Sequence, residues 1–140
     1  MLRKVGLLSI VGLAGLLVTA DTRIAAQPSA SFEGTYVLAS AVKLNQTYVS
    51  RSGQMGYCPE STPSPISISQ GRAWYVSSSG RQLAGTVSPQ GQILIRVSEP
   101  RDSSRGPFEM DVNGVVDGAG TVRARQRGNS CSYDLTWRKQ

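Results

Sequence analysis

Arg81-Gln82-Leu83-Ala84-Gly85-Thr86-Val87-Ser88-Pro89-Gln90-Gly91-Gln92-Ile93-Leu94-Ile95-Arg96-Val97 is the stretch that decides the fold. Apolar and polar residues alternate on both sides of its centre, which is the pattern of strands with one buried face. At the centre, Ser88-Pro89-Gln90-Gly91 places proline and glycine where a turn between two strands uses them. Pairing Val87 with Ile93 keeps the apolar residues of both flanks on one face. The stretch therefore predicts a β-hairpin.

Similar units on both sides of this hairpin predict an all-β chain of about eight short antiparallel strands with glycine-rich turns. The expected strands lie near 32–44, 66–69, 73–77, 81–87, 92–97, 108–116, 122–127 and 131–138. An even number of strands lets the first and last pair antiparallel, which closes a barrel and leaves no free edge. We therefore expect an up-and-down, lipocalin-like barrel, with a two-sheet β-sandwich as the alternative.

Two details of the strands concern the inner face of the barrel. In the first strand, the residues predicted to point inward share one parity: Phe32, Tyr36, Leu38, Val42 and Leu44. In the third, pairing Ile68 with Ala73 across the Gln70-Gly71 turn places Tyr75 inside and Trp74 outside. An outward tryptophan is unusual, so either a bulge flips this strand or Trp74 is an exposed apolar group.

The segment Asn45–Pro65 differs in kind from the strands around it. It is rich in Ser, Gly, Thr and Pro and shows no sustained period, so the sequence predicts one long loop. A loop of this length in a small domain is expected to be functional or pinned, and Cys58 offers a pin.

The N-terminus has the pattern of a secretory signal peptide. Met1-Leu2-Arg3-Lys4 is basic, and the apolar run Val5–Val18 is shorter than the roughly 20 residues that a membrane-spanning helix needs. We predict cleavage after Ala26, with cleavage after Ala20 as the alternative, and no membrane anchor in the processed chain. Residues 27–31 would then form a short tail before a single β-barrel domain over 32–140, in a periplasmic or secreted protein.

The charge of the chain is mildly basic. The 140 residues include 15 Lys and Arg against 9 Asp and Glu, a net charge of +6, and removing residues 1–26 leaves +4. This charge fits an anionic component of the cell envelope or an acidic partner, and equally ordinary solubility.

The only two cysteines, Cys58 and Cys131, predict one disulfide in an oxidising compartment. The chain-entropy model gives a bridge over so long a separation roughly 4 kcal/mol of stabilisation. A free reactive thiol and metal ligation are the alternatives for these residues.

One set of residues spread along the chain carries a resemblance: Phe32-x-Gly34-x-Tyr36, Cys58, Ile66 to Gly71, Gly85-x-Val87 before Gly91, Gly118-x-Gly120, Cys131-x-Tyr133 and Trp137. The chain resembles a group of small exported bacterial all-β proteins of unknown function, which share an aromatic-glycine first strand, one cysteine after it, and a Cys and Trp near the end. This resemblance implies a fold and an exported location without catalytic residues. Gly34-x-Tyr36 and Arg138 also look like the Gly-x-Trp and arginine of lipocalins, with Tyr in place of Trp.

Composition excludes several kinds of active site. The chain contains no histidine, so triads with histidine and histidine-containing zinc sites are excluded. Glu109 and Asp111 are the closest carboxylate pair, but we expect them on the outer face, opposite Arg125 or Arg127. No catalytic residue, metal site or cofactor is predicted.

Three groups of residues are candidates for binding. Arg123, Arg125 and Arg127 form an outward stripe for an anion, or an ordinary solvated face; nucleic acid is not expected as a partner. The candidates for a surface contact are Trp74, Val76, Leu94, Tyr48 and Tyr57. The candidates for an interior lining are Tyr36, Tyr75, Phe108, Tyr133 and Trp137.

These groups lead to three functional hypotheses. The leading one is a non-enzymatic exported barrel that binds an envelope protein or anionic envelope component through Asn45–Pro65 and neighbouring outer residues. The second is a barrel that binds a small apolar ligand inside, and the third is an enzyme of unrecognised type. A filled interior with an exposed Trp74 favours the first, and a cavity open at one end favours the second.

Overall fold

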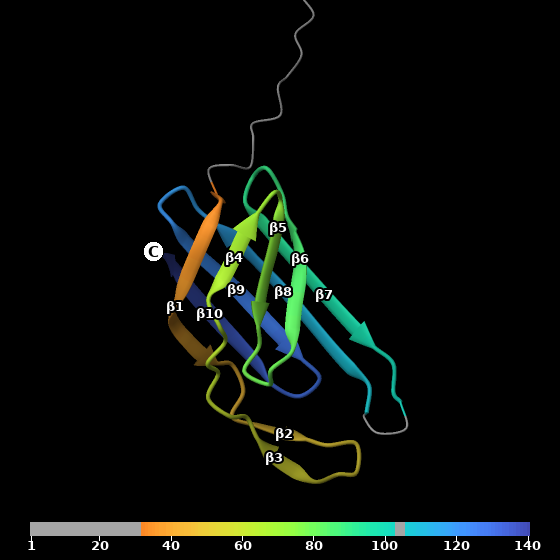
Figure 1. Ribbon diagram of the computed structural model, residues 1–140. Coiled ribbons are helices and arrows are strands. Elements are labelled where there is room, and N and C mark those ends of the chain that lie inside the picture. Colours follow the sequence, from red (N-terminus) through yellow and green to blue (C-terminus); the bar gives the residue numbers. More distant parts are fainter. Residues whose placement is uncertain (1–31, 103–105) are drawn as a thin grey trace, which may run out of the picture.

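The protein is described by a computed structural model that covers residues 32–102 and 106–140. The predicted signal peptide and the tail that follows it lie outside the described residues. In the described part, eight strands form one closed antiparallel barrel, and two short strands form a separate sheet at one end of it (Figure 1).

The barrel strands follow one another around the wall in the order β1-β10-β9-β8-β7-β6-β5-β4. Because β1 pairs with both β10 and β4, the sheet closes on itself, which confirms the barrel and excludes the β-sandwich. The barrel strands are β1 (Gly34–Lys43), β4 (Ile66–Ser69), β5 (Arg72–Val76), β6 (Gln82–Val87), β7 (Gln92–Glu99), β8 (Phe108–Val116), β9 (Thr121–Gly128) and β10 (Ser132–Lys139).

The β6–β7 hairpin has the predicted register. Val87 lies opposite Ile93, and the amide of Gly91 donates to the carbonyl oxygen of Ser88 at 2.9 Å across the turn. Gly91 has a φ of 85°, a left-handed conformation that glycine adopts without the clash a side chain would cause. The apolar residues of both strands therefore share the inner face, and Leu83, Val87, Ile93 and Ile95 are buried.

In β1 the predicted inner face is wrong beyond its middle. Tyr36 is buried, but Val42 is 56% exposed and Leu44 is exposed as well. The register between β1 and β10 shifts between Leu38 and Ser40, which marks a β-bulge. A bulge adds one residue to a strand and so exchanges the two faces beyond it. Ala41, rather than Val42, therefore packs against the core.

Two glycines allow the barrel strands to lie close together. A Cβ on Gly85 would lie 2.1 Å from the carbonyl oxygen of Leu94 on β7, and one on Gly114 would lie 2.5 Å from the Cβ of Ala124 on β9. Real side chains do not approach so closely, so any other residue would push these strands apart. The narrow barrel depends on these two positions.

The segment predicted as one long loop contains two strands. β2 (Thr47–Val49) and β3 (Met55–Tyr57) pair antiparallel, and a turn from Ser50 to Gln54 joins them. Strands of three residues are too short to show a period in the sequence, which is why the pattern did not reveal them. Their hairpin lies beyond the lower end of the barrel in Figure 1, at the opposite end from the start of β1.

A pocket at the mouth of the barrel

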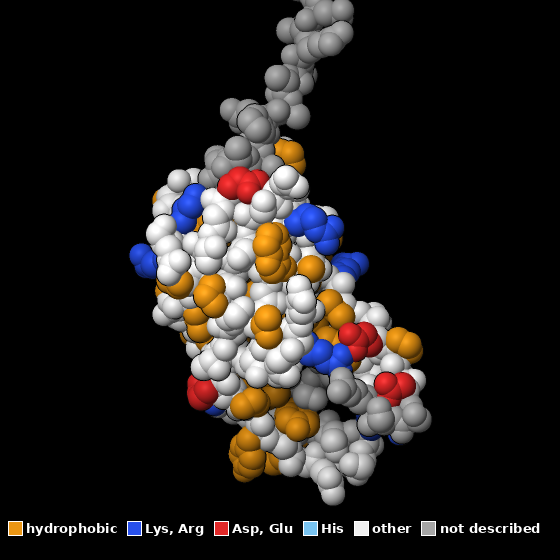
Figure 2. Space-filling model, viewed as in Figure 1, with side chains coloured by type: hydrophobic (Ala, Val, Ile, Leu, Met, Phe, Trp, Pro, Cys, Tyr) orange, Lys and Arg blue, Asp and Glu red, His pale blue; other side chains and the backbone are white. Residues whose placement is uncertain are grey.

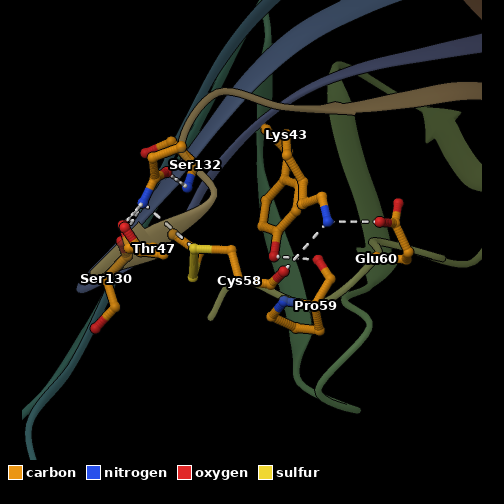
Figure 3. The surroundings of a disulfide bond; sticks show 10 residues. Lys43, Thr47, Cys58, Pro59, Glu60, Ser130 and Ser132 are labelled. Carbon is orange, nitrogen blue, oxygen red and sulfur yellow. Dashed lines mark hydrogen bonds and ion pairs between the residues drawn. A yellow bond between two sulfur atoms is a disulfide. The ribbon is translucent and has the colours of Figure 1, made fainter. Parts of the chain in front are cut away.

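The chain between β3 and β4 crosses the lower end of the barrel, which we call the mouth. Cys58 on this segment is bonded to Cys131 in the β9–β10 turn, with the two Cα atoms 5.6 Å apart. The predicted disulfide is therefore confirmed, and it ties the segment to the barrel wall (Figure 3). We call residues 58–64 the strap.

Polar contacts hold the chain around the disulfide in place. The side-chain amide of Asn45 donates to the carbonyl oxygen of Ser130 at 2.8 Å, and its oxygen accepts from the amide of Ser132 at 2.9 Å. The ammonium of Lys43 lies 2.5 Å from a carboxylate oxygen of Glu60 and 3.4 Å from the carbonyl oxygen of Cys58 (Figure 3). The inward turn of Lys43 follows from the β1 bulge.

The far end of the strap is fixed to the opposite side of the mouth. The amide of Thr62 donates to the hydroxyl of Ser78 at 2.7 Å, in the turn between β5 and β6. Ser64 exchanges hydrogen bonds with the backbone of Val76, and its carbonyl oxygen accepts from the indole nitrogen of Trp137 at 3.1 Å. The strap therefore bridges the mouth from β10 to β5.

A pocket of about 470 Å³ opens beside the strap. This volume lies within the range of small-molecule binding sites, roughly 300–1,000 Å³. Residues from the hairpin, the strap, the β5–β6 turn and the lower ends of β8, β9 and β10 line it: Tyr48, Tyr57, Pro59, Glu60, Ser61, Thr62, Ser77, Ser78, Ser79, Phe108, Met110, Gln126, Gly128, Asn129, Ser130, Cys131 and Tyr133.

The walls of the pocket differ in chemistry. Phe108, Met110 and three tyrosines supply apolar and aromatic surface, while the strap and the β5–β6 turn contribute hydroxyl groups. Among the described lining residues only Glu60 is charged, and Lys43 neutralises it. The pocket therefore suits a largely apolar molecule without a net charge, because a buried charge here would find no counter-charge.

Two tyrosine hydroxyls are hydrogen-bonded on the inner side of the pocket, one from a lining residue and one from the packed interior behind it. The hydroxyl of Tyr133 donates to the carbonyl oxygen of Pro59 at 2.9 Å, and that of Tyr75 donates to the side-chain oxygen of Gln126 at 2.5 Å. Burial raises the pKa of both phenols; the Glu60 carboxylate also raises that of Tyr133, and the Lys43 ammonium opposes the shift. Both groups are therefore neutral hydrogen-bonding hydroxyls at physiological pH.

The structure divides the predicted lining residues into two groups. Phe108 and Tyr133 line the pocket, and they do so together with Tyr48 and Tyr57, which the sequence suggested as surface contacts. Tyr36, Tyr75 and Trp137 are buried in the packed interior instead, where the rings of Tyr75 and Trp137 meet edge to face at 5.3 Å between centroids.

Sequence reasoning missed Met110, Gln126 and the serines of the β5–β6 turn as pocket residues. A signal existed for Gln126. In β9 it follows Val122 and Ala124 at the inward parity, so the alternation places a polar amide where an apolar residue is expected. The serines gave no such signal, because turn residues are commonly polar.

Trp74, Val76 and Leu94 lie on the outer wall and do not line the pocket. They are 38%, 40% and 42% exposed, so Trp74 lies on the side that the alternation predicts and no bulge flips β5. Figure 2 shows scattered hydrophobic side chains over β4, β5 and β6 and a denser group at the lower end, where the hairpin lies. Val49, Met55 and Tyr57 of the hairpin are exposed.

Two members of the arginine stripe are paired with aspartates. Arg125 donates twice to the carboxylate of Asp134, at 2.8 and 3.0 Å, and these hydrogen bonds lower the pKa of that carboxyl group. Arg123 lies 3.5 Å from Asp117. Within the described residues Arg127 has no ion pair. Most of the positive charge of the stripe is therefore neutralised.

Both acids on β8 lie on the outer face as expected, and one of them lies opposite an arginine of the stripe. Asp111 lies opposite Arg127 in the β8–β9 register, but its ion pair is with Arg96 of β7, at 3.6 Å. The register places Arg125 opposite Asn113, and the backbone amide of Glu109 donates to the side-chain oxygen of Asn129 at 2.8 Å. Over 32–102 and 106–140, no group of three or more acidic or cysteine residues is placed to hold a metal ion.

No protein-family model matches the chain, and no curated protein or solved structure matches it. The similarity to small exported all-β proteins therefore stays a prediction. No helix among the described residues is both long and apolar enough to cross a membrane.

Proposed function

We propose that this protein is a non-enzymatic binding protein that takes a small, uncharged, largely apolar molecule at the mouth of its barrel. The observation that carries the proposal is the 470 Å³ pocket, walled by aromatic side chains and held open by a strap that is fixed at both ends. A concave site of this size that combines aromatic and apolar walls with hydroxyl and amide groups is typical of ligand-binding proteins.

This proposal reverses the order of the two hypotheses drawn from the sequence. The interior is filled around Tyr36, Tyr75 and Trp137, so a ligand would not enter the barrel along its whole length. The space lies at the mouth, where Asn45–Pro65 and the ends of the strands meet. The segment expected to contact a partner would thus form one wall of a ligand site.

We also propose that the protein is exported. The Cys58–Cys131 disulfide is typical of an oxidising compartment such as the periplasm or the extracellular space, and the N-terminal sequence has the pattern of a signal peptide. N-terminal sequencing of the protein recovered from its source cells tests this. An N-terminus at Gln27 or Asp21 would support export, and an uncleaved chain in the cytoplasm would contradict it.

The ligand site can be tested with phenylnaphthylamine, an uncharged apolar probe that fluoresces more strongly in an apolar site. We expect saturable binding of one probe to the unmodified protein. Met110→Trp fills the pocket and should weaken binding at least tenfold. Leu94→Trp adds the same ring to the outer wall of the neighbouring strand and should leave binding unchanged.

Any of three results would overturn the ligand proposal. The first is no saturable binding to the unmodified protein. The second is unchanged binding to Met110→Trp in a variant whose circular dichroism shows an intact barrel. Equal loss in both tryptophan variants would likewise place the probe on the outer surface rather than in the pocket.

A second candidate function rests on Trp74, which is 38% exposed on the outer wall near Val76. An exposed tryptophan of this kind is typical of a contact with another protein of the envelope. Acrylamide should quench its fluorescence readily when Trp137→Phe leaves it as the only tryptophan. A pull-down from envelope extract, with Trp74→Ala as the control, then tests for the contact; equal capture by both proteins would contradict it.

A further inference from the structure

Gln126 is a polar side chain on the inner face of β9, and it lines the pocket. It is only 5% exposed, and it lies between Val112 of β8 and Tyr133 of β10 in the strand registers. A polar group at such a position costs free energy unless it is hydrogen-bonded. Its presence among apolar neighbours therefore calls for a reason.

The hydrogen bonds of Gln126 are only half satisfied. Its side-chain oxygen accepts from the hydroxyl of Tyr75, which fixes the direction of the amide. The side-chain nitrogen of Gln126 has no hydrogen-bond partner among the described residues. In the same part of the chain, every polar side-chain atom that is fully buried has a hydrogen-bond partner. The nitrogen is therefore not sealed in the core. Since Gln126 lines the pocket, its two N–H groups face that space.

We infer that Gln126 selects the ligand: the pocket takes an uncharged, flat, apolar molecule that carries an oxygen acceptor, such as a ketone, and the Gln126 amide donates to that oxygen. This inference rests on the proposed function and names its ligand class. The Tyr75 hydroxyl holds the amide in place, and Tyr133 and Phe108 supply the walls on which a flat molecule packs.

A matched pair of probes tests the inference in the unmodified protein. Acetylnaphthalene and isopropenylnaphthalene have the same shape and differ in a C=O group against a C=CH₂ group. We expect the ketone to bind about fivefold more tightly, which corresponds to one neutral hydrogen bond of about 1 kcal/mol. The side-chain amide signals of Gln126 in an NMR spectrum should shift with the ketone and stay in place with the olefin.

Gln126→Met keeps the length of the side chain and removes the donor, so the preference for the ketone should disappear while the olefin still binds. Because this change leaves the Tyr75 hydroxyl without its acceptor, Gln126→Met with Tyr75→Phe removes both partners and protects the fold. The double variant should show the same loss of preference. Phe108→Leu changes a wall and should lower the affinity for both probes equally.

The outcomes distinguish a failure of the role of Gln126 from a failure of the ligand site. If the unmodified protein binds both probes equally, the selection by Gln126 is wrong and the ligand site itself stands. A preference that survives in both methionine variants also overturns the role of Gln126. If neither probe binds, the proposed function fails, and the selection fails with it.

Discussion

The two ends of the barrel are built from the same alternating strands, yet one end is filled and the other is hollow. At the filled end, Phe32 lies over the strands, and its carbonyl oxygen accepts a hydrogen bond from the hydroxyl of Tyr36 at 2.7 Å. A Cβ on Gly91 there would lie 2.3 Å from the carbonyl oxygen of Val116. At the mouth, the strap and the hairpin enclose a pocket of about 470 Å³.

The difference lies in what connects the strands at each end. Tight turns close the filled end, with residues such as Gly91 and Gly120 in left-handed conformations, and the inner residues pack directly against Phe32. At the mouth a long connection crosses the opening, and it is held at the rim by Cys131 and Ser78 and from the interior by single hydrogen bonds of Tyr133 and Trp137. The alternating strands thus form the wall of the barrel, and the connections between strands determine which end contains a pocket.

Trp137→Ala should have the largest effect, because it removes the largest buried side chain of the filled part and its contact with Tyr75. We expect a loss of about 3–5 kcal/mol in the free energy of unfolding, measured by urea denaturation. Trp74→Ala is the matched control on the outer wall and should cost under about 1 kcal/mol. Similar costs for the two variants would contradict the division between interior and outer wall.

Replacing both cysteines, as Cys58→Ser with Cys131→Ser, should cost about 2–4 kcal/mol in the free energy of unfolding. The structure should loosen first at the mouth, because the disulfide ties the strap to the barrel there. Hydrogen exchange should speed up most at the backbone amides of position 58 and of Thr62, which hydrogen-bond at the two sides of the mouth. Uniformly faster exchange that includes Tyr36 would show that the two ends are not independent.

Tyr75→Phe tests the boundary between the filled part and the pocket. The change leaves the side-chain oxygen of Gln126 without its donor and should cost about 1–2 kcal/mol by urea denaturation. Tyr36→Phe removes a hydroxyl at the filled end and serves as the comparison. A Tyr75→Phe variant as stable as the unmodified protein would mean that the Gln126 amide is not held by this bond.

The pH dependence of stability provides a second measurement on Tyr75. Burial raises the pKa of its phenol above the ordinary value of 10.0, so the folded protein keeps the proton more strongly than the unfolded chain. This contribution to stability is therefore fully present below pH 10 and is lost as the pH rises through the raised pKa. Urea denaturation between pH 8 and 11 should show the fall, which Tyr75→Phe should reduce.

Asp134→Asn should have the smallest effect, because its pair with Arg125 lies on the exposed outer wall. We expect little change in the midpoint of thermal unfolding. The Arg125 hydrogen bonds lower the pKa of Asp134 below its ordinary 3.8, so any contribution is present above that pH and is lost as the pH falls. An NMR titration should show the low pKa in the unmodified protein and a higher value in Arg125→Gln.

The sequence predicted the wall of the barrel well, because the alternation in 81–97 and 131–138 has the same period as the strands that form there. It failed at the β1 bulge, where one extra residue moves Val42 outward without a mark in the residue pattern. The short hairpin also escaped, since three-residue strands show no period. The pocket depends on where these irregular parts lie in space, and periodicity alone does not determine that.

The most direct test of the account is an NMR titration of the oxidised protein with acetylnaphthalene, followed at assigned backbone amides and methyl groups. We predict saturable shifts at pocket residues such as Met110, Gly128 and Ser130, and none at Val76 or Leu94 on the outer wall. Saturable shifts confined to the outer wall, or no saturable shift anywhere, would contradict a ligand site at the mouth of the barrel.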